Sequence, residues 1–139
     1  MSTNALQKAL AEKGYLLADG ATGTNLFTMG LQTGDAPELW NVDYPERIQA
    51  HYQSFVDAGS DIVLSNTFGG THFRLALHNA QDRVAELNAA GVRIARKVAD
   101  AIVDRKVLVG ASIGPTGELP EPMGSLTKQA AVAAFAEQA

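Results

Sequence analysis

A polar side chain and a series of backbone N–H groups that could bind a small ligand follow the first apolar segment of the chain, at Asp19, Gly20, Ala21 and Thr22. In the stretch LLADGATGTNLFTMG, the apolar residues are followed by Asp19, by a Gly-Thr turn and then by a short helix predicted at residues 25–29. The first N–H groups of a helix lack partners and bind carboxylate or phosphate. An aspartate beside them could hold an ammonium group, so together they fit the two charged ends of an amino acid. The alternative is that Asp19 and Thr24 only cap the helix.

A second polar cluster, SNTFGG, follows the apolar residues that begin at Ile62. The Asn66 amide can both accept from and donate to a polar substrate, and the glycines let a ligand approach the backbone. The alternative for Asn66 is a structural one, in which it joins neighbouring loops. A third cluster, GPTG at residues 114–117, indicates a rigid loop after another apolar segment.

The chain contains no cysteine, and its three histidines have no zinc-binding pattern. Without cysteine there is no disulfide, no thiolate nucleophile and no cysteine metal site in these residues. His72 and His78 are six residues apart, which matches no common zinc spacing. We therefore predict surface or hydrogen-bonding roles for the histidines, His51 included, and assign no metal ligand to this chain.

Three apolar segments would position these clusters, at residues 15–18, from 62 and from 107. Runs that are apolar on both faces are typical of buried parallel strands. Helical patterns at residues 45–59, at 82–104 and from about 125 alternate with them. The order predicts an α/β fold with parallel strands, in which polar strand ends form the ligand site.

Two architectures fit three such strand-helix units, a doubly wound sheet and the N-terminal part of a (β/α)8 TIM barrel. A complete barrel needs about 250 residues, so in that case residues 1–139 would be an incomplete barrel domain. An open piece of barrel exposes a strand edge and apolar faces. We therefore expect it to associate with a remaining C-terminal barrel half or with a second copy of the chain.

The charge balance argues against nucleic acid as a partner, and the hydropathy of the chain argues against a membrane. With 11 basic and 15 acidic residues, the chain has a net charge of -4 and no basic cluster that suits nucleic acid. No apolar stretch approaches the roughly 18 residues of a membrane span, and the N-terminal sequence lacks the apolar core of a signal peptide. We expect a cytoplasmic protein that binds neither nucleic acid nor membrane.

Five motifs in order resemble the N-terminal portion of the homocysteine S-methyltransferase family. They are DGATGT, PELWN, AGSDIVLSNTFGGT, ELNAAGVRIAR and GASIGPTGELPEPMGS. The family includes the homocysteine module of cobalamin-dependent methionine synthase and the betaine-homocysteine methyltransferases. The likeness extends from about Tyr15 to the last residue.

The resemblance implies a (β/α)8 barrel in which zinc, held by three cysteines, binds homocysteine as a thiolate that takes a methyl group. It also implies that Asp19 and the amides of Gly20, Ala21 and Thr22 bind the amino-acid end of homocysteine, and that Asn66 lines the same mouth. Betaine, S-methylmethionine and methyl-cobalamin remain open as methyl donors. Because this chain has no cysteine, the zinc ligands would have to come from outside it.

The leading hypothesis is therefore part of a zinc-dependent homocysteine S-methyltransferase that forms methionine. The alternative is a truncated half-barrel without catalysis that acts as an oligomerising or ligand-binding module. A third hypothesis is a phosphate-binding α/β enzyme. The sequence argues against it, because it contains no glycine-rich loop followed by Lys and Ser or Thr.

Overall fold

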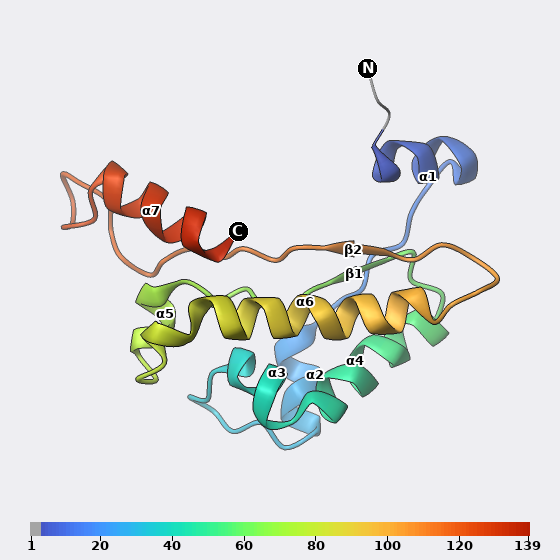
Figure 1. Ribbon diagram of the computed structural model, residues 1–139, viewed down its shortest axis with the longest axis horizontal. Helices are drawn as coiled ribbons and strands as arrows, with labels where there is room; N and C mark the ends of the chain where they lie inside the picture. Colours follow the sequence, from blue (N-terminus) through green and yellow to red (C-terminus); the bar gives the residue numbers. More distant parts are fainter. Residues whose placement is uncertain (1–3) are drawn as a thin grey trace.

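The computed structural model describes residues 4–139 and has the α/β class that the sequence predicts (Figure 1). The strands are β1 (Ile62–Leu64) and β2 (Leu108–Gly110). The helices are α1 (Ala5–Lys13), α2 (Thr22–Thr28), α3 (Trp40–Asp43), α4 (Pro45–Asp57), α5 (His72–Ala76), α6 (Val84–Asp100) and α7 (Lys128–Gln138), with 3-10 turns η1 (Pro37–Leu39) and η2 (Gln81–Arg83). Within residues 4–139, no helix combines the length and the hydropathy that a membrane span requires.

The two strands pair in parallel, as predicted for the segments that begin at residues 62 and 107. Ile62 lies opposite Leu108, and Leu64 lies opposite Gly110. The chain between them passes through α6, which supplies the crossover that parallel strands need. Parallel pairing places the carboxyl ends of both strands at the same edge of the sheet.

The predicted first strand is much shorter than expected. Residues 15–18 make a single parallel bridge, from Ala18 to Ile62, on the other side of β1 from β2. Tyr15 and Leu17 remain 61% and 52% exposed, so little apolar burial holds this segment flat against its neighbour. The described residues thus have two strands and one bridge, and the three complete strand-helix units remain a prediction.

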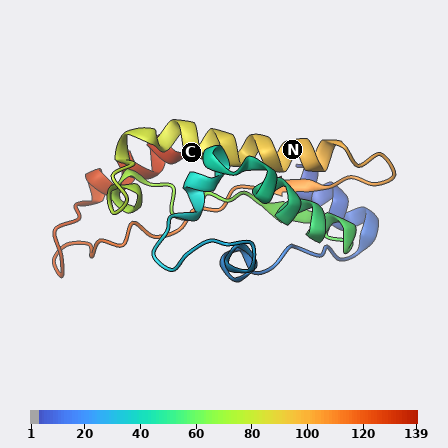
Figure 2. The same cartoon turned by 90° about the horizontal axis from the view of Figure 1, so that it is seen from below.

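Helices α4 and α6 form the core together with one face of the sheet (Figures 1 and 2). Side chains alternate between the two faces of a strand, and here Val63 is completely buried whereas its neighbour Leu64 is 40% exposed. The main core contains the following residues of α4, α6 and the strand segments: Ile48, Tyr52, Val56, Ala95, Val98, Ala99, Val63 and Val107. Among the described residues, the opposite face of β1 has no such cover.

The predicted helices are present with shifted ends. Helix α4 begins at Pro45, which suits a first turn, and the chain leaves it at Gly59 with a φ of 99° that favours glycine. Helix α6 occupies 84–100 rather than 82–104, and α2 begins three residues earlier than predicted, at Thr22. Helix α7 starts at Lys128 rather than near 125, because the Thr127 side chain accepts the Ala130 N–H and caps it there.

Helix α1 was not predicted, although the sequence contains its signals. Asn4 and Gln7 exchange side-chain and backbone hydrogen bonds in a capping box, and Gly14 ends the helix in a left-handed conformation. The helix has no buried residue and stands apart from the main body (Figure 1). Its attachment to the sheet is the side chain of Lys13, whose ammonium group contacts Asp61.

Candidate functional site

The predicted polar segments meet at the carboxyl edge of the sheet. The Asp19 carboxylate accepts the N–H of Leu64, the last residue of β1, at 2.9 Å. The segment after β1 contacts the segment after β2, where the Phe68 carbonyl accepts the Gly114 N–H at 2.9 Å. In parallel α/β folds ligands bind at this edge, and the polar segments that the sequence singles out lie together there.

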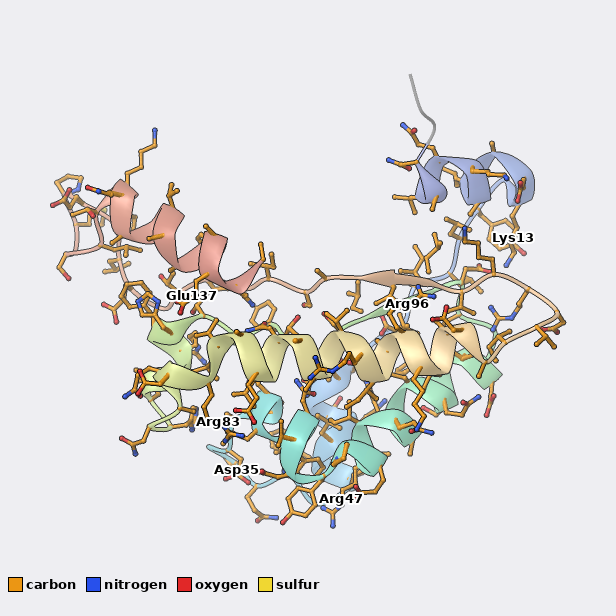
Figure 3. The ribbon with its side chains drawn as sticks, in the orientation of Figure 1. Lys13, Asp35, Arg47, Arg83, Arg96 and Glu137 are labelled. Atoms are coloured by element: carbon orange, nitrogen blue, oxygen red, sulfur yellow. The ribbon has the colours of Figure 1, made fainter. Side chains whose placement is uncertain are left out.

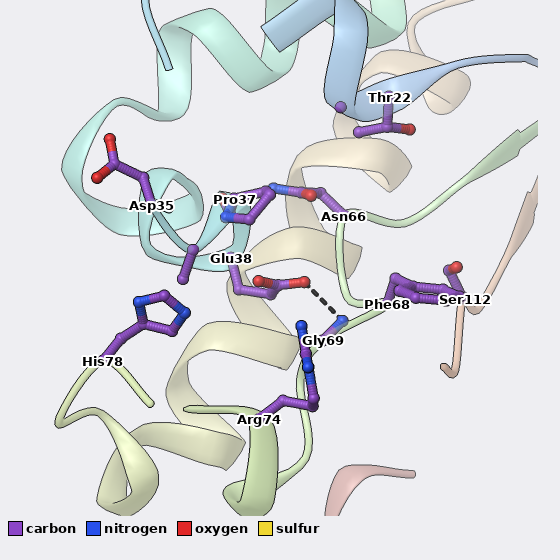
Figure 4. A pocket seen from close by; sticks show the side chains of 12 residues that line it. Thr22, Asp35, Pro37, Glu38, Asn66, Phe68, Gly69, Arg74, His78 and Ser112 are labelled. Carbon is purple, nitrogen blue, oxygen red and sulfur yellow. Dashed lines mark hydrogen bonds between the residues drawn. The ribbon is translucent and has the colours of Figure 1, made fainter. Parts of the chain in front are cut away.

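A cavity of about 370 Å³ opens at this edge (Figure 4). Two of the predicted site residues, Thr22 and Asn66, line it. The other predicted residues, Asp19, Gly20 and Ala21, lie outside its lining. The cavity is also lined by five polar or charged side chains to which sequence reasoning assigned no binding role: Asp35, Glu38, Arg74, His78 and Ser112.

Asn66 is held on three sides by hydrogen bonds. Its side-chain nitrogen donates to the carbonyl of Pro37 at 2.8 Å and to Oδ1 of Asn41 at 2.9 Å. Its backbone N–H donates to the Tyr52 hydroxyl at 2.6 Å, and its carbonyl accepts from Asn41 at 2.8 Å. Both amide hydrogens are used, so Asn66 can offer a ligand only its acceptor oxygen Oδ1. Asn66 therefore does join loops, as the structural alternative held, yet its Oδ1 has no hydrogen-bond partner within residues 4–139.

Asn41 and Tyr52 support the site and were missed from the sequence. Asn41 Nδ2 also donates to the carbonyl of Leu87 on α6, at 3.1 Å. Burial raises the pKa of Tyr52, an effect that the Asn66 N–H opposes and the Asp19 charge adds to. The available signals were a lone asparagine beside Trp40, in PELWN, and a hydroxyl on the apolar face of α4.

Asp19 has one satisfied and one unsatisfied oxygen. Oδ2 accepts the Leu64 N–H, whereas Oδ1 is buried and has no hydrogen-bond partner within residues 4–139. Desolvation raises the pKa of the Asp19 carboxyl, and the N–H groups of Leu64 and of Asp19 itself partly offset that rise. None of the described lysines or arginines forms an ion pair with it. A hydrogen-bond donor on a ligand would satisfy Oδ1.

The amides that follow Asp19 are also free. The N–H groups of Gly20, Ala21 and Thr22 make no hydrogen bond to any described residue. Helix α2 has no side-chain cap at its start. The alternative in which Asp19 and Thr24 only cap this helix is therefore wrong, because Asp19 bonds to β1 instead. Together, Asp19 and the three amides form what we call the Asp19 cradle.

Glu38 places a carboxylate on the cavity wall. Its side chain comes from η1, is only 5% exposed and accepts the Gly69 N–H at 2.6 Å. A Cβ at residue 69 would lie 3.0 Å from this oxygen, so glycine permits the close approach. Arg74 of α5 lies across from Glu38 in the cavity (Figure 4) and forms no ion pair with any described residue.

The three histidines occupy different environments. His51 is 1% exposed and packs edge-on against Phe55, and burial lowers the pKa of its imidazole. Neither ring nitrogen has a hydrogen-bond partner within residues 4–139, so the predicted surface or hydrogen-bonding role is wrong for His51. His72 lies 3.2 Å from Glu137 near the surface, and His78 lines the cavity.

These residues do not fit a zinc site of the kind that the family resemblance implies. The chain has no cysteine. In the part of the chain that the structure describes, no three His, Asp or Glu side chains are grouped to hold a metal ion. A metal in a complete protein would need ligands from other residues.

The comparisons with known proteins identify the family. The family model described as homocysteine S-methyltransferase matches residues 16–139 of this chain. The chain belongs to the homocysteine S-methyltransferase family. Two methionine synthases are similar in sequence to this chain, one from Mycobacterium tuberculosis and one from Mycobacterium leprae. The first is 34% identical over 113 residues, 76% of this chain, and the second is 32% identical over 123 residues, 83% of this chain.

The fold is similar to that of the homocysteine methyltransferase MmuM from Escherichia coli. Its metallated form matches with a TM-score of 0.70 and 28% identity, and its oxidised form with 0.68 and 29%. Each match covers 82% of this chain and 42% of MmuM. The chain spans 10% of the length of the two methionine synthases. Family membership is thus shown, whereas the activity of the longer relatives becomes a proposal for this chain.

Proposed function

We propose that these residues are the N-terminal part of a homocysteine S-methyltransferase barrel and bind the amino-acid end of homocysteine. One observation carries the proposal. A buried carboxylate oxygen of Asp19, without a partner in residues 4–139, lies at a strand end beside three free amides. A carboxylate next to free N–H groups matches the ammonium and carboxylate of an amino acid.

In this proposal each predicted residue has a defined task. Asp19 accepts a hydrogen bond from the ligand ammonium, while Leu64 keeps the carboxylate oriented through its N–H. The amides of Gly20, Ala21 and Thr22 donate to the ligand carboxylate. Asn66 lines the neighbouring cavity with a single free acceptor. Charge-assisted hydrogen bonds of this kind are stronger than neutral ones, so the cradle would favour a zwitterion over a neutral analogue.

The reaction would transfer a methyl group to the sulfur of homocysteine and form methionine. A free thiol has a pKa near ~8.5 and is mostly protonated at neutral pH, and zinc in a complete family barrel would favour its thiolate. The present residues supply no zinc ligand set, so their proposed share is to bind and orient the amino-acid end. The donor, among betaine, S-methylmethionine and methyl-cobalamin, and a cytoplasmic location remain predictions.

Calorimetric titration of homocysteine into this chain, with and without zinc, tests the proposal. We expect binding that does not require zinc and that Asp19→Ala weakens at least about tenfold, as for loss of a charge-assisted hydrogen bond. Asp57→Ala, at an exposed aspartate of α4, serves as the matched control and should bind as the parent chain does. Absence of binding in both conditions, or full binding by Asp19→Ala, would contradict the proposal.

A non-catalytic half-barrel that binds another chain is the second candidate. The observation in its favour is the exposure of large apolar side chains near the strands, with Leu17, Leu64 and Ile113 between 40% and 52% exposed. Exposed apolar surface beside a strand edge favours association. The partner would be a C-terminal barrel half or a second copy. Failure of homocysteine to bind in the titration would leave this candidate as the better one.

A further inference from the structure

The cavity next to the Asp19 cradle has two free acceptor oxygens of its own. Glu38 and Asn66 are each 5% exposed and both line it. One oxygen of Glu38 accepts the Gly69 N–H, and the other has no partner among the described residues. Oδ1 of Asn66 also has no hydrogen-bond partner among the described residues. Neither free oxygen is among the atoms enclosed by protein, so both are open to a ligand in the cavity.

These two groups select a positively charged donor. Asn66 has no amide hydrogen left to donate, because Pro37 and Asn41 accept both. A carboxylate is an acceptor only. An anionic group at this wall would face two acceptors and a negative charge, whereas a cationic amine would satisfy both oxygens.

Arg74 supplies the opposite charge in the same cavity. Its side chain extends from α5 toward Glu38 and Gly69 (Figure 4). Within residues 4–139 it makes neither an ion pair nor a side-chain hydrogen bond. A guanidinium presents donors in a fork that matches both oxygens of a carboxylate. The charges of Glu38 and Arg74 therefore lie in one cavity without neutralising each other by direct contact.

We propose that this cavity is a second zwitterion site, which binds a small molecule with a cationic amine and a carboxylate. The amine contacts Glu38 and Asn66, and the carboxylate contacts Arg74. A volume of about 370 Å³ is at the small end of ligand pockets and suits a compound the size of an amino acid. Of the cradle residues only Thr22 lines the cavity, whereas Asp19, Gly20 and Ala21 do not, so the second site does not need the Asp19 carboxylate.

Amide NMR titration of the complete 139-residue chain with L-methionine tests the second site. We expect shifts of the Gly69 and Ser112 amides, and Glu38→Gln and Arg74→Ala should each weaken binding at least about tenfold. Glutamine at residue 38 keeps an acceptor for the Gly69 N–H and removes only the charge. Arg96→Ala, at an exposed arginine of α6, should bind as the parent does.

Two neutralised probes separate ligand contact from a structural role. Methioninamide lacks the carboxylate and N-acetylmethionine lacks the amine charge, so the parent should bind each at least about tenfold more weakly than methionine. Arg74→Ala should no longer distinguish methionine from methioninamide, and Glu38→Gln should no longer distinguish it from N-acetylmethionine. If either variant weakens methionine and its matching probe equally, the residue does not contact the ligand and the proposal is wrong.

The same titration separates the two sites. Shifts confined to Gly20 and Ala21, which do not line the cavity, and lost in Asp19→Asn would support the cradle and overturn the second site. Shifts at Gly69 that persist in Asp19→Asn and vanish in Arg74→Ala would support the second site. If methionine shifts no amide around the cavity, the second site does not exist in this chain.

Discussion

Two aspartates, one beside each end of strand β1, differ in how fully the protein satisfies their carboxylates and in the direction of their pKa shifts. At the amino end, Asp61 accepts from Lys13 at 2.7 Å and from the Leu17 N–H at 2.9 Å. The pKa of Asp61 is lowered, first by the Leu17 N–H and then by Lys13. At the carboxyl end, Asp19 has a hydrogen bond from Leu64 to one oxygen, and desolvation raises its pKa.

The amino end joins separate segments of the chain. Lys13 brings α1 to the sheet, at the other end of the long axis from Glu137 of α7 (Figure 3). Arg105, from the loop before β2, donates to the carbonyls of Val56 and Ser60 at 2.6 and 2.7 Å and lies 3.9 Å from Asp61. A cation after the end of α4 also complements the helix dipole.

The difference separates a structural carboxylate from one available to a ligand. At Asp61 both oxygens have partners from the protein, so nothing remains for a ligand to satisfy. At Asp19 a buried oxygen lacks a partner within residues 4–139, which costs stability unless something else supplies the hydrogen bond. Groups with this kind of perturbed pKa concentrate at functional sites, and here the perturbed group lies at the carboxyl edge of the sheet.

The largest effect is expected for Asp61→Ala. This change removes the acceptor for the Leu17 N–H and for Lys13, and it separates three chain segments. Loss of a buried charged acceptor leads us to expect a fall of about 2–3 kcal/mol in the free energy of unfolding. Urea denaturation at neutral pH measures it.

Asp100→Ala, at an exposed position of α6, is the control for Asp61→Ala. Asp100 pairs with Arg96 at the surface, and loss of an exposed pair should cost less than about 1 kcal/mol. Equal losses in the two variants would show that Asp61 is no more important to the fold than a surface ion pair, and the contrast between the strand ends would disappear.

Tyr52→Phe tests the neutral hydrogen bonding of the carboxyl end. The hydroxyl is the acceptor for the buried Asn66 N–H, and removing it should cost about 1–2 kcal/mol. Because this interaction joins neutral groups, the loss should be the same at low and high salt, whereas the loss in Asp61→Ala should shrink with added salt. A Tyr52→Phe protein as stable as the parent would show that Asn66 is not held by this hydroxyl.

The sequence was sufficient to predict that polar segments follow the strands, at the carboxyl edge of the sheet, but not the hydrogen-bond network that holds them there. Asp19 and Asn66 are predicted as candidates because each follows an apolar run, which is a local signal. Asn41 meets Asn66 across 25 residues, and Lys13 meets Asp61 across 48. Pairings at such separations leave no periodic trace in a single sequence, so these residues could be identified only after folding.

The predicted extent of the first strand was wrong for a related reason. The apolar run at residues 15–18 has the local composition of a strand, yet it forms one bridge because the tertiary contacts that would extend it are absent among the described residues. Strand formation depends on neighbouring strands and burial more than on local preference. Glu38 was overlooked because a single acidic residue in a polar-looking loop normally stays at the surface, whereas the Gly69 N–H holds it inside.

Asp61→Asn tests the comparison through pH. The folded pKa of Asp61 lies below its ordinary value of 3.8, so its contribution is present above that pH and is lost as pH falls through the folded pKa. The asparagine variant should therefore lose less stability than the parent on acidification below about pH 4. Urea denaturation over a pH series measures this, and identical acid profiles would contradict a lowered pKa.

Asp19→Asn should show the smallest effect and the opposite sign. The folded pKa of Asp19 lies above 3.8, so the protonated form contributes stability below that pH, which is lost as pH rises through the folded pKa. At neutral pH the variant should be more stable than the parent, by less than about 1 kcal/mol because the carboxylate is partly screened by solvent. The gain should vanish in acid. A less stable variant at pH 7 would mean that the protein already satisfies this carboxylate, which would then be as structural as Asp61.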